Sequence, residues 1–218
     1  MAGIAENLQV VRARIGARPG VTLLAVSKGQ SVERIREAMA AGQSAFGENY
    51  VQEAVQKMQQ LPALEWHLIG PLQSNKTRVA AERFDWVQTI ASEKVARRLS
   101  EQRPAHLAPL NVLIQVNVSA EKSKSGVAPH EARNLASVIA AMPRLRLRGL
   151  MAIPEPGAPR SRYQEVRKAF DALKDEFGFD TLSMGMSDDL DLALEEGATM
   201  VRIGTSIFGP RLNQQSAA

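Results

Sequence analysis

The sequence predicts an α/β fold, a (β/α)8 TIM-type barrel with an extra N-terminal helix, and three observations lead to it. Short apolar runs alternate with amphipathic stretches along the 218 residues, a pattern typical of a parallel sheet with crossover helices. Eight such strand–helix pairs can be counted, and eight units close naturally into a barrel. An open doubly wound sheet would bring a glycine-rich first turn, yet residues 27–30 hold one glycine rather than a GxGxxG pattern. The barrel is therefore preferred.

The first half of the chain begins with an amphipathic helix at residues 1–16, whose apolar positions recur every three or four residues. The apolar run 22–27 is the first expected strand, and the helix 32–41 after it starts behind Ser31 and stops before Gly42, a plausible C-terminal cap. The same alternation predicts further strands at 44–47, 66–70 and 86–90 and helices at 50–60, 74–83 and 93–102.

The second half repeats the alternation. Arg144, Arg146 and Arg148 alternate with leucines, as in a strand with one solvated face. Proline-rich residues 154–159 form a loop between a strand and a helix. We expect a single domain over 1–218 that ends in a flexible tail at 213–218. The expected strands are 111–118, 147–153, 181–186 and 200–204, and the expected helices are 130–141, 161–177, 188–196 and a short 206–212.

Composition excludes several classes of function. The net charge is +4, but the basic residues are scattered and aromatic residues make up 5%, too few for stacking platforms, so no nucleic-acid partner is expected. No apolar run approaches the ~18 residues of a membrane span, and the N-terminus lacks the pattern of a signal peptide. We expect a cytoplasmic protein with no membrane partner. The chain has no cysteine, and its three histidines, His67, His106 and His130, do not form an HxH motif, so a metal-dependent barrel enzyme is disfavoured.

A lysine and an anion site are expected at the same end of the barrel. Lys28 closes the first strand, and barrels commonly bind phosphate after strands seven and eight. Those loops hold Ser187 and the Gly204–Thr205 pair, which offer hydroxyl donors and a close backbone approach. An amine beside a phosphate site fits an aldehyde cofactor that carries a phosphate, which suggests pyridoxal 5′-phosphate held as a Schiff base.

Each of these residues also has a purely structural interpretation. Lys28 could be a solvated strand-end lysine, Ser187 only an N-cap and Gly204 only a turn residue. Two carboxylates, Asp188 and Asp189, would compete with a phosphate in the same loop. Lys76 is a weaker candidate for the reactive amine because it opens a helix rather than closing a strand.

Seven motifs in order resemble the pyridoxal phosphate homeostasis proteins, which are similar to the barrel domain of alanine racemase without its second domain. The resemblance spans about residues 21–211, and Pro71 departs from it without affecting the cofactor contacts. The motifs are AVSK ending at Lys28, Phe46-Gly-Glu-Asn49, Trp66-His-Leu-Ile-Gly70 with Gln73-Ser-Asn-Lys76, Gln115-Val-Asn117 with Lys124-Ser-Gly126, Gly149-Leu-Met151, Ser183-Met-Gly-Met-Ser-Asp188 and Val201-Arg-Ile-Gly-Thr205.

The resemblance implies a set of cofactor-binding residues and no catalytic ones. Lys28 would form the Schiff base, Arg202 would face the pyridine nitrogen, and Ser187, Gly204 and Thr205 would hold the phosphate. Three more residues would line the pocket: Asn49, His67 and Met151. For His67 an equally weighted alternative is a strand-end histidine that is hydrogen-bonded to the backbone.

The same resemblance bears on whether the protein only carries the cofactor or is an enzyme that uses it. An arginine does not readily give up its proton to the ring nitrogen, and racemases of this type take their second base, a tyrosine, from a further domain. The two tyrosines here, Tyr50 and Tyr163, are both expected on helices. The preferred hypothesis is an intracellular protein of vitamin B6 homeostasis that stores, buffers or delivers the cofactor, as a monomer, with pyridoxal phosphate-dependent apoenzymes as partners. The alternative is a small racemase or lyase dependent on the same cofactor.

Overall fold

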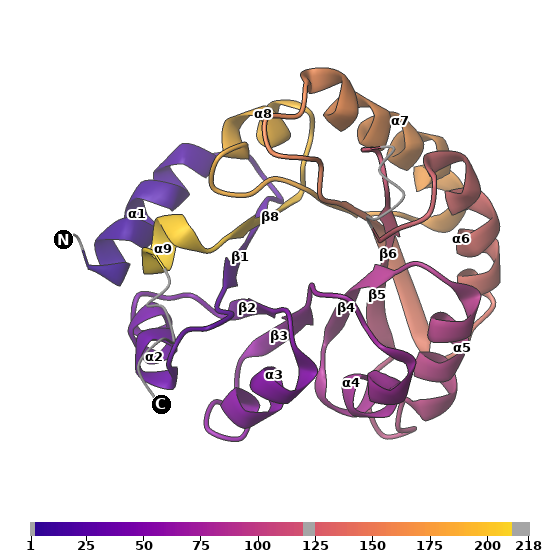
Figure 1. The fold of residues 1–218 in the computed structure, drawn as a ribbon, viewed down its shortest axis with the longest axis horizontal. Coiled ribbons are helices and arrows are strands. Elements are labelled where there is room, and N and C mark those ends of the chain that lie inside the picture. The colour runs from indigo at the N-terminus through magenta and orange to yellow at the C-terminus, as the bar shows by residue number, and fades with distance from the viewer. Residues whose placement is uncertain (1–2, 120–124, 211–218) are drawn as a thin grey trace, which may run out of the picture.

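Eight parallel strands close into a barrel in the computed structural model, which describes residues 3–119 and 125–210 (Figure 1). Each strand pairs with its neighbours in sequence, and β1 closes the ring by pairing with β8. The predicted (β/α)8 barrel is thereby confirmed. The strands are β1 (Thr22–Val26), β2 (Ala45–Glu48), β3 (Glu65–Leu68), β4 (Trp86–Ile90), β5 (Leu110–Val116), β6 (Leu145–Ala152), β7 (Thr181–Ser183) and β8 (Met200–Ile203).

Helices surround the barrel, one after each strand, and the extra helix α1 (Ile4–Ile15) lies beside α2 and α9 (Figure 1). Burial of four apolar residues of α1 at helical spacing explains its position on the barrel. The other helices are α2 (Val32–Ala40), α3 (Val51–Met58), α4 (Thr77–Arg83), α5 (Glu93–Gln102), α6 (Ala132–Ala140), α7 (Arg160–Phe177), α8 (Leu190–Glu195) and α9 (Thr205–Phe208), with 3-10 turns η1 (Ser74–Lys76) and η2 (Pro129–Glu131).

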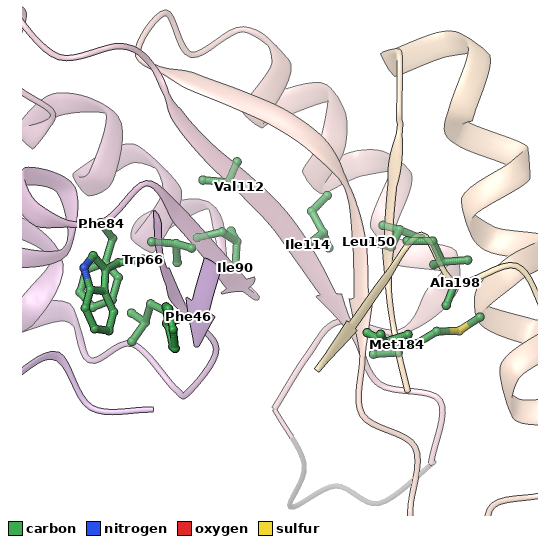
Figure 2. Packing of buried hydrophobic residues seen from close by; sticks show 14 of the residues in the cluster. Phe46, Trp66, Phe84, Ile90, Val112, Ile114, Leu150, Met184 and Ala198 are labelled. Atoms are coloured by element: carbon green, nitrogen blue, oxygen red, sulfur yellow. The ribbon is translucent and has the colours of Figure 1, made fainter. Parts of the chain in front are cut away.

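The strands are buried on both faces. One face packs against the helices and includes Phe46, Trp66 and Ile114, part of the cluster in Figure 2. The other face fills the barrel with a separate cluster that no helix residue joins, to which Leu24, Leu113 and Met151 belong. Because side chains alternate along a strand, a polar side chain that points to the same face as this second cluster lies in the barrel interior. That property locates the polar residues described below.

The boundaries differ from the sequence expectation mainly after β7. The expected strand 181–186 ends at Ser183, because Gly185 has φ +95° and its backbone packs so closely on Ala193 that an added Cβ would lie 2.5 Å away. Helix α8 accordingly starts at Leu190 rather than at residue 188, and Ser187 is not its N-cap. The end of the expected helix 206–212, the tail 213–218 and Lys124 lie outside the described residues. Within the described ranges, no helix is long and apolar enough to cross a membrane.

Candidate functional site

Lys28 lies in a tight turn at the carboxyl end of β1. The Gln30 N–H donates to the Ser27 carbonyl at 3.0 Å, and Gly29 has φ +70°, so residues 27–30 form a hydrogen-bonded turn with Lys28 at its second position. Glycine is required at the third position because other residues rarely adopt that φ. The side chain of Lys28 is half-buried. The turn therefore presents a partly shielded amine at the end of the barrel where such folds carry their sites.

The predicted phosphate residues come together from the loops after β7 and β8. Gly204 is the N-cap of α9, Thr205 opens that helix, and the Ser206 N–H points to the Ser187 hydroxyl oxygen at 3.4 Å. A Cβ at Gly204 would meet the Val26 carbonyl oxygen at 3.3 Å, so this glycine also allows close packing on β1. Both the packing and the site interpretation of Gly204 remain compatible with the structure.

One of the two competing carboxylates is engaged elsewhere. Asp189 accepts hydrogen bonds from the Tyr163 hydroxyl at 2.5 Å and from the Met186 N–H at 2.5 Å. Burial, with the hydrogen bond to Asp189, raises the pKa of Tyr163 above its usual value, so the phenol stays protonated. Tyr163 lies on α7 as expected, whereas Tyr50 immediately precedes α3 and is 65% exposed.

Arg202 is buried in β8 and is held at two points. Its Nη1 donates to the Ser183 hydroxyl oxygen at 2.7 Å, and its Nη2 donates to the Ala152 carbonyl at 2.8 Å. Burial lowers the pKa of Arg202 to about 10, which still leaves the guanidinium charged at neutral pH. These two contacts fix the guanidinium at the carboxyl ends of β6 and β7.

A hydrogen-bond chain crosses the barrel interior from Arg202 to Glu65, and sequence reasoning missed most of it. The Ser183 hydroxyl donates to Gln88 Oε1 at 2.7 Å, Gln88 Nε2 lies 2.9 Å from His67 Nδ1, and His67 Nε2 lies 2.7 Å from Glu65 Oε1. Because the amide nitrogen of Gln88 can only donate, His67 Nδ1 accepts and Nε2 carries the proton. Every donor points away from Arg202 and toward the Glu65 carboxylate.

The role expected for His67 changes accordingly. Its side chain is fully buried, stacks on Trp86 with ring centroids 5.1 Å apart, and uses both ring nitrogens on side chains. The alternative of a histidine bonded to the backbone is therefore wrong. Burial lowers the pKa of His67, opposed by the hydrogen bond to Glu65, and that same bond lowers the pKa of Glu65.

We expect the stability of the protein to fall as the pH drops from 7.5 to 5.5. His67 has a lowered pKa in the folded state, so the unfolded chain takes up a proton near the ordinary value of 6.5 while the folded chain resists it. The stability is thus complete above pH 6.5 and is lost below it, with a slope of at most about 1.4 kcal/mol per pH unit for one proton. Urea unfolding of wild type and His67→Phe at both pH values measures it. An unchanged slope in His67→Phe would contradict the assignment.

Asn49 and Met151 lie in different surroundings. Met151 is fully buried inside the barrel, whereas Asn49 is half-buried after β2 and lines a cavity of about 240 Å³ with Thr89 and Gln115. Asn49 contacts Gly70, where an added Cβ would lie 2.2 Å from the Asn49 carbonyl oxygen. The glycine therefore sets how closely β3 approaches Asn49.

Gly70→Ala is expected to displace Asn49 and to cost about 1–3 kcal/mol of stability, the usual range for overpacking. The backbone of Asn49 cannot rotate away from the new methyl group as a flexible side chain could. Thermal unfolding measures the loss, and Gly3→Ala is the matched control because nothing lies within 4 Å of its added Cβ. Equal stabilities of the two variants would show that Asn49 can move at no cost.

The donor chemistry of these residues fits pyridoxal 5′-phosphate. A phosphate can accept hydrogen bonds from neutral donors, and the site offers the hydroxyls of Ser187 and Thr205 and the first amides of α9. Lys28 offers an amine suited to an aldehyde. Arg202 is a cationic donor of the kind that would suit a ring nitrogen. Of the two carboxylates in this loop, Asp189 is bonded to Tyr163 and Asp188 is exposed to solvent.

Comparisons with known proteins find relatives over nearly the whole chain. Residues 1–211 match the family model of the alanine racemase N-terminal domain. A protein of Pseudomonas aeruginosa named pyridoxal phosphate homeostasis protein is 55% identical over 97% of this chain and 97% of its own length. One of Escherichia coli with the same name is 53% identical over 97% of this chain and 98% of its own.

A solved structure extends the comparison. PipY of Synechococcus elongatus, with pyridoxal phosphate bound, superimposes with a TM-score of 0.84 at 37% identity, and the match covers 94% of this chain and 100% of PipY. Its barrel is thus similar along its whole length to the one described above.

Proposed function

The chain belongs to the pyridoxal phosphate homeostasis proteins, whose barrel is that of the alanine racemase N-terminal domain, and from this premise we propose that it binds pyridoxal 5′-phosphate as a Schiff base on Lys28. Its function in vitamin B6 homeostasis would be to store, buffer or deliver the cofactor with little or no catalysis. The observation that carries the proposal is the turn that presents the half-buried residue Lys28 at the same end of the barrel as Arg202 and the α9 loop.

Each proposed contact follows from the chemistry of a side chain. Ser187, Thr205 and the amides beside Gly204 would hold the phosphate, and Arg202 would donate to the ring nitrogen. Asn49 and Met151 would line the pocket, while His67 would act through Gln88 rather than by direct contact. When bound, the cofactor supplies an aldehyde that condenses with amines and a ring that can accept electron density.

Two features support a carrier over the alternative, a small racemase or lyase. Arg202 is charged and bonded to Ser183 and Ala152, so it would keep its proton and make the ring a poor electron sink, which argues against a lyase but not against a racemase. Tyr163, a candidate second base, donates to Asp189, and its pKa is raised. We place the protein in the cytoplasm as a monomeric single domain, with apoenzymes that need the cofactor as its partners.

The test uses purified protein, added pyridoxal 5′-phosphate, visible absorbance, and reduction with borohydride followed by peptide mass analysis. We expect an absorbance band and a pyridoxyl adduct on the peptide that contains Lys28. Incubation with L- and D-alanine then separates the two functions, because a racemase interconverts the isomers and a carrier leaves them. Absence of any adduct would refute the proposal, and rapid racemisation would favour the alternative.

A further inference from the structure

Three charged side chains meet beside the turn that carries Lys28. Glu48, at the end of β2, is fully buried, and Lys57 of α3 is 6% exposed. Lys57 Nζ lies 2.7 Å from Glu48 Oε1 and 2.7 Å from Oε1 of Glu53, one helical turn earlier on α3. Buried charges are rare in proteins unless a specific arrangement requires them.

All three members of this cluster bond to the turn itself. Lys57 Nζ donates to the Ser27 carbonyl at 2.8 Å, and the Ser27 hydroxyl donates to Glu48 Oε1 at 2.6 Å. The Gly29 N–H donates to Glu53 Oε1 at 2.6 Å. The residues before and after Lys28 are thus each anchored by charge-assisted hydrogen bonds, which are stronger than neutral ones.

The charge balance of the cluster depends on Lys57. Burial raises the pKa of Glu48, while the ion pair with Lys57 and the bond from Ser27 oppose that rise. Without Lys57, two carboxylates would remain side by side, one of them in the barrel wall. The pKa of Glu48 would then rise further, which would weaken the charge assistance of the hydrogen bond from Ser27.

We propose that Glu48, Glu53 and Lys57 are positioning residues that hold the Ser27–Gly29 turn so that the Lys28 amine meets the cofactor aldehyde. The inference rests on the proposed function of Lys28. In the step concerned, the neutral amine nitrogen bonds to the aldehyde carbon, the aldehyde oxygen leaves as water, and that water carries away the two amine protons. A fixed turn accelerates this step because attack needs the nitrogen close to the carbon along one direction.

The test compares Lys57→Met with wild type in the full-length chain. The rate of condensation at saturating pyridoxal 5′-phosphate is followed by absorbance, and binding before condensation is measured with pyridoxine 5′-phosphate, which has no aldehyde. We expect the saturated rate to fall by about tenfold or more, the scale of a positioning effect, while the affinity for the alcohol changes little. A role in folding alone would not separate these two readouts.

Arg103→Met is the matched control. Arg103 is 6% exposed and donates to the carbonyls of Ala81, Phe84 and Ala108, and it lies in the connection between α5 and β5, at the opposite end of the barrel from Lys28. This variant should lose stability but keep the condensation rate. Equal slowing in both variants would overturn the proposal, because it would show a general effect of destabilisation.

A second variant covers the case in which Lys57→Met does not fold. Glu53 has a side chain that is 28% exposed, so Glu53→Ala removes the acceptor of the Gly29 N–H with less risk to folding, and it should also slow condensation. Wild-type rates in either folded variant would overturn the positioning role and leave the proposed function intact. A wild-type protein that forms no adduct on Lys28 would instead refute the proposed function, and the positioning role with it.

Discussion

Replacing Lys28 by alanine is expected to abolish covalent attachment of pyridoxal 5′-phosphate. The Schiff base needs a primary amine held at the aldehyde, and in the proposed site that amine is Lys28, which the turn of residues 27–30 presents at the carboxyl end of β1. Borohydride reduction followed by peptide mass should give a pyridoxyl adduct on wild type and none on Lys28→Ala. The proposed phosphate contacts do not involve Lys28, so weak, reversible binding should persist at high cofactor concentration.

Lys76→Ala is the control for this prediction. Lys76 ends the 3-10 turn η1 near the same end of the barrel, and the sequence makes it a weaker candidate for the amine. We expect Lys76→Ala to form the adduct as wild type does. An adduct that survives in Lys28→Ala and disappears in Lys76→Ala would move the attachment point and require a different site.

The barrel could be predicted because its signals are local. Each apolar run fixes one strand, each amphipathic stretch fixes one helix, and eight repeats of the pair leave few alternatives to closure. The end of β7 could not be predicted, because the apolar residues Met184 and Met186 continue the pattern while the positive φ of Gly185 ends the strand. That φ depends on packing against Ala193, a residue of the next helix.

The candidate site was predictable to the extent that it follows strand order. Lys28 after β1 and Ser187 and Gly204 after β7 and β8 converge because parallel strands end at one side of the barrel. Gln88, Lys57 and Glu48 were missed, since nothing in their local sequence says that their partners lie on other strands or on a helix. For Gln88, the available signal is its place in a strand buried on both faces. The residues two positions before and after it, Trp86 and Ile90, are apolar, whereas Gln88 is polar.

Gln88→Leu should show what the interior chain contributes. Leucine is similar in size to glutamine, but it leaves the His67 Nδ1 atom without a donor and the Ser183 hydroxyl without an acceptor. Buried groups left unpaired cost about 1–3 kcal/mol each, so we expect the loss of two such partners to lower the free energy of unfolding by about 2–6 kcal/mol. Gln164→Leu, on the exposed face of α7, should change it by no more than about 0.5 kcal/mol.

A double-mutant cycle with Ser183→Ala tests whether the chain acts as a unit. Ser183 links Gln88 to Arg202, so the loss of Ser183 or Gln88 also removes part of the stabilisation that the other provides. The double variant should therefore lose less stability than the two single variants added together. Coupling of about 0.5–3 kcal/mol is typical of residues in one hydrogen-bond network. Simple additivity would mean that the hydrogen bond between Ser183 and Gln88 adds nothing to what the two side chains contribute separately. Coupling would mean instead that these two adjacent members of the chain from Arg202 to Glu65 stabilise the barrel through their contact with each other.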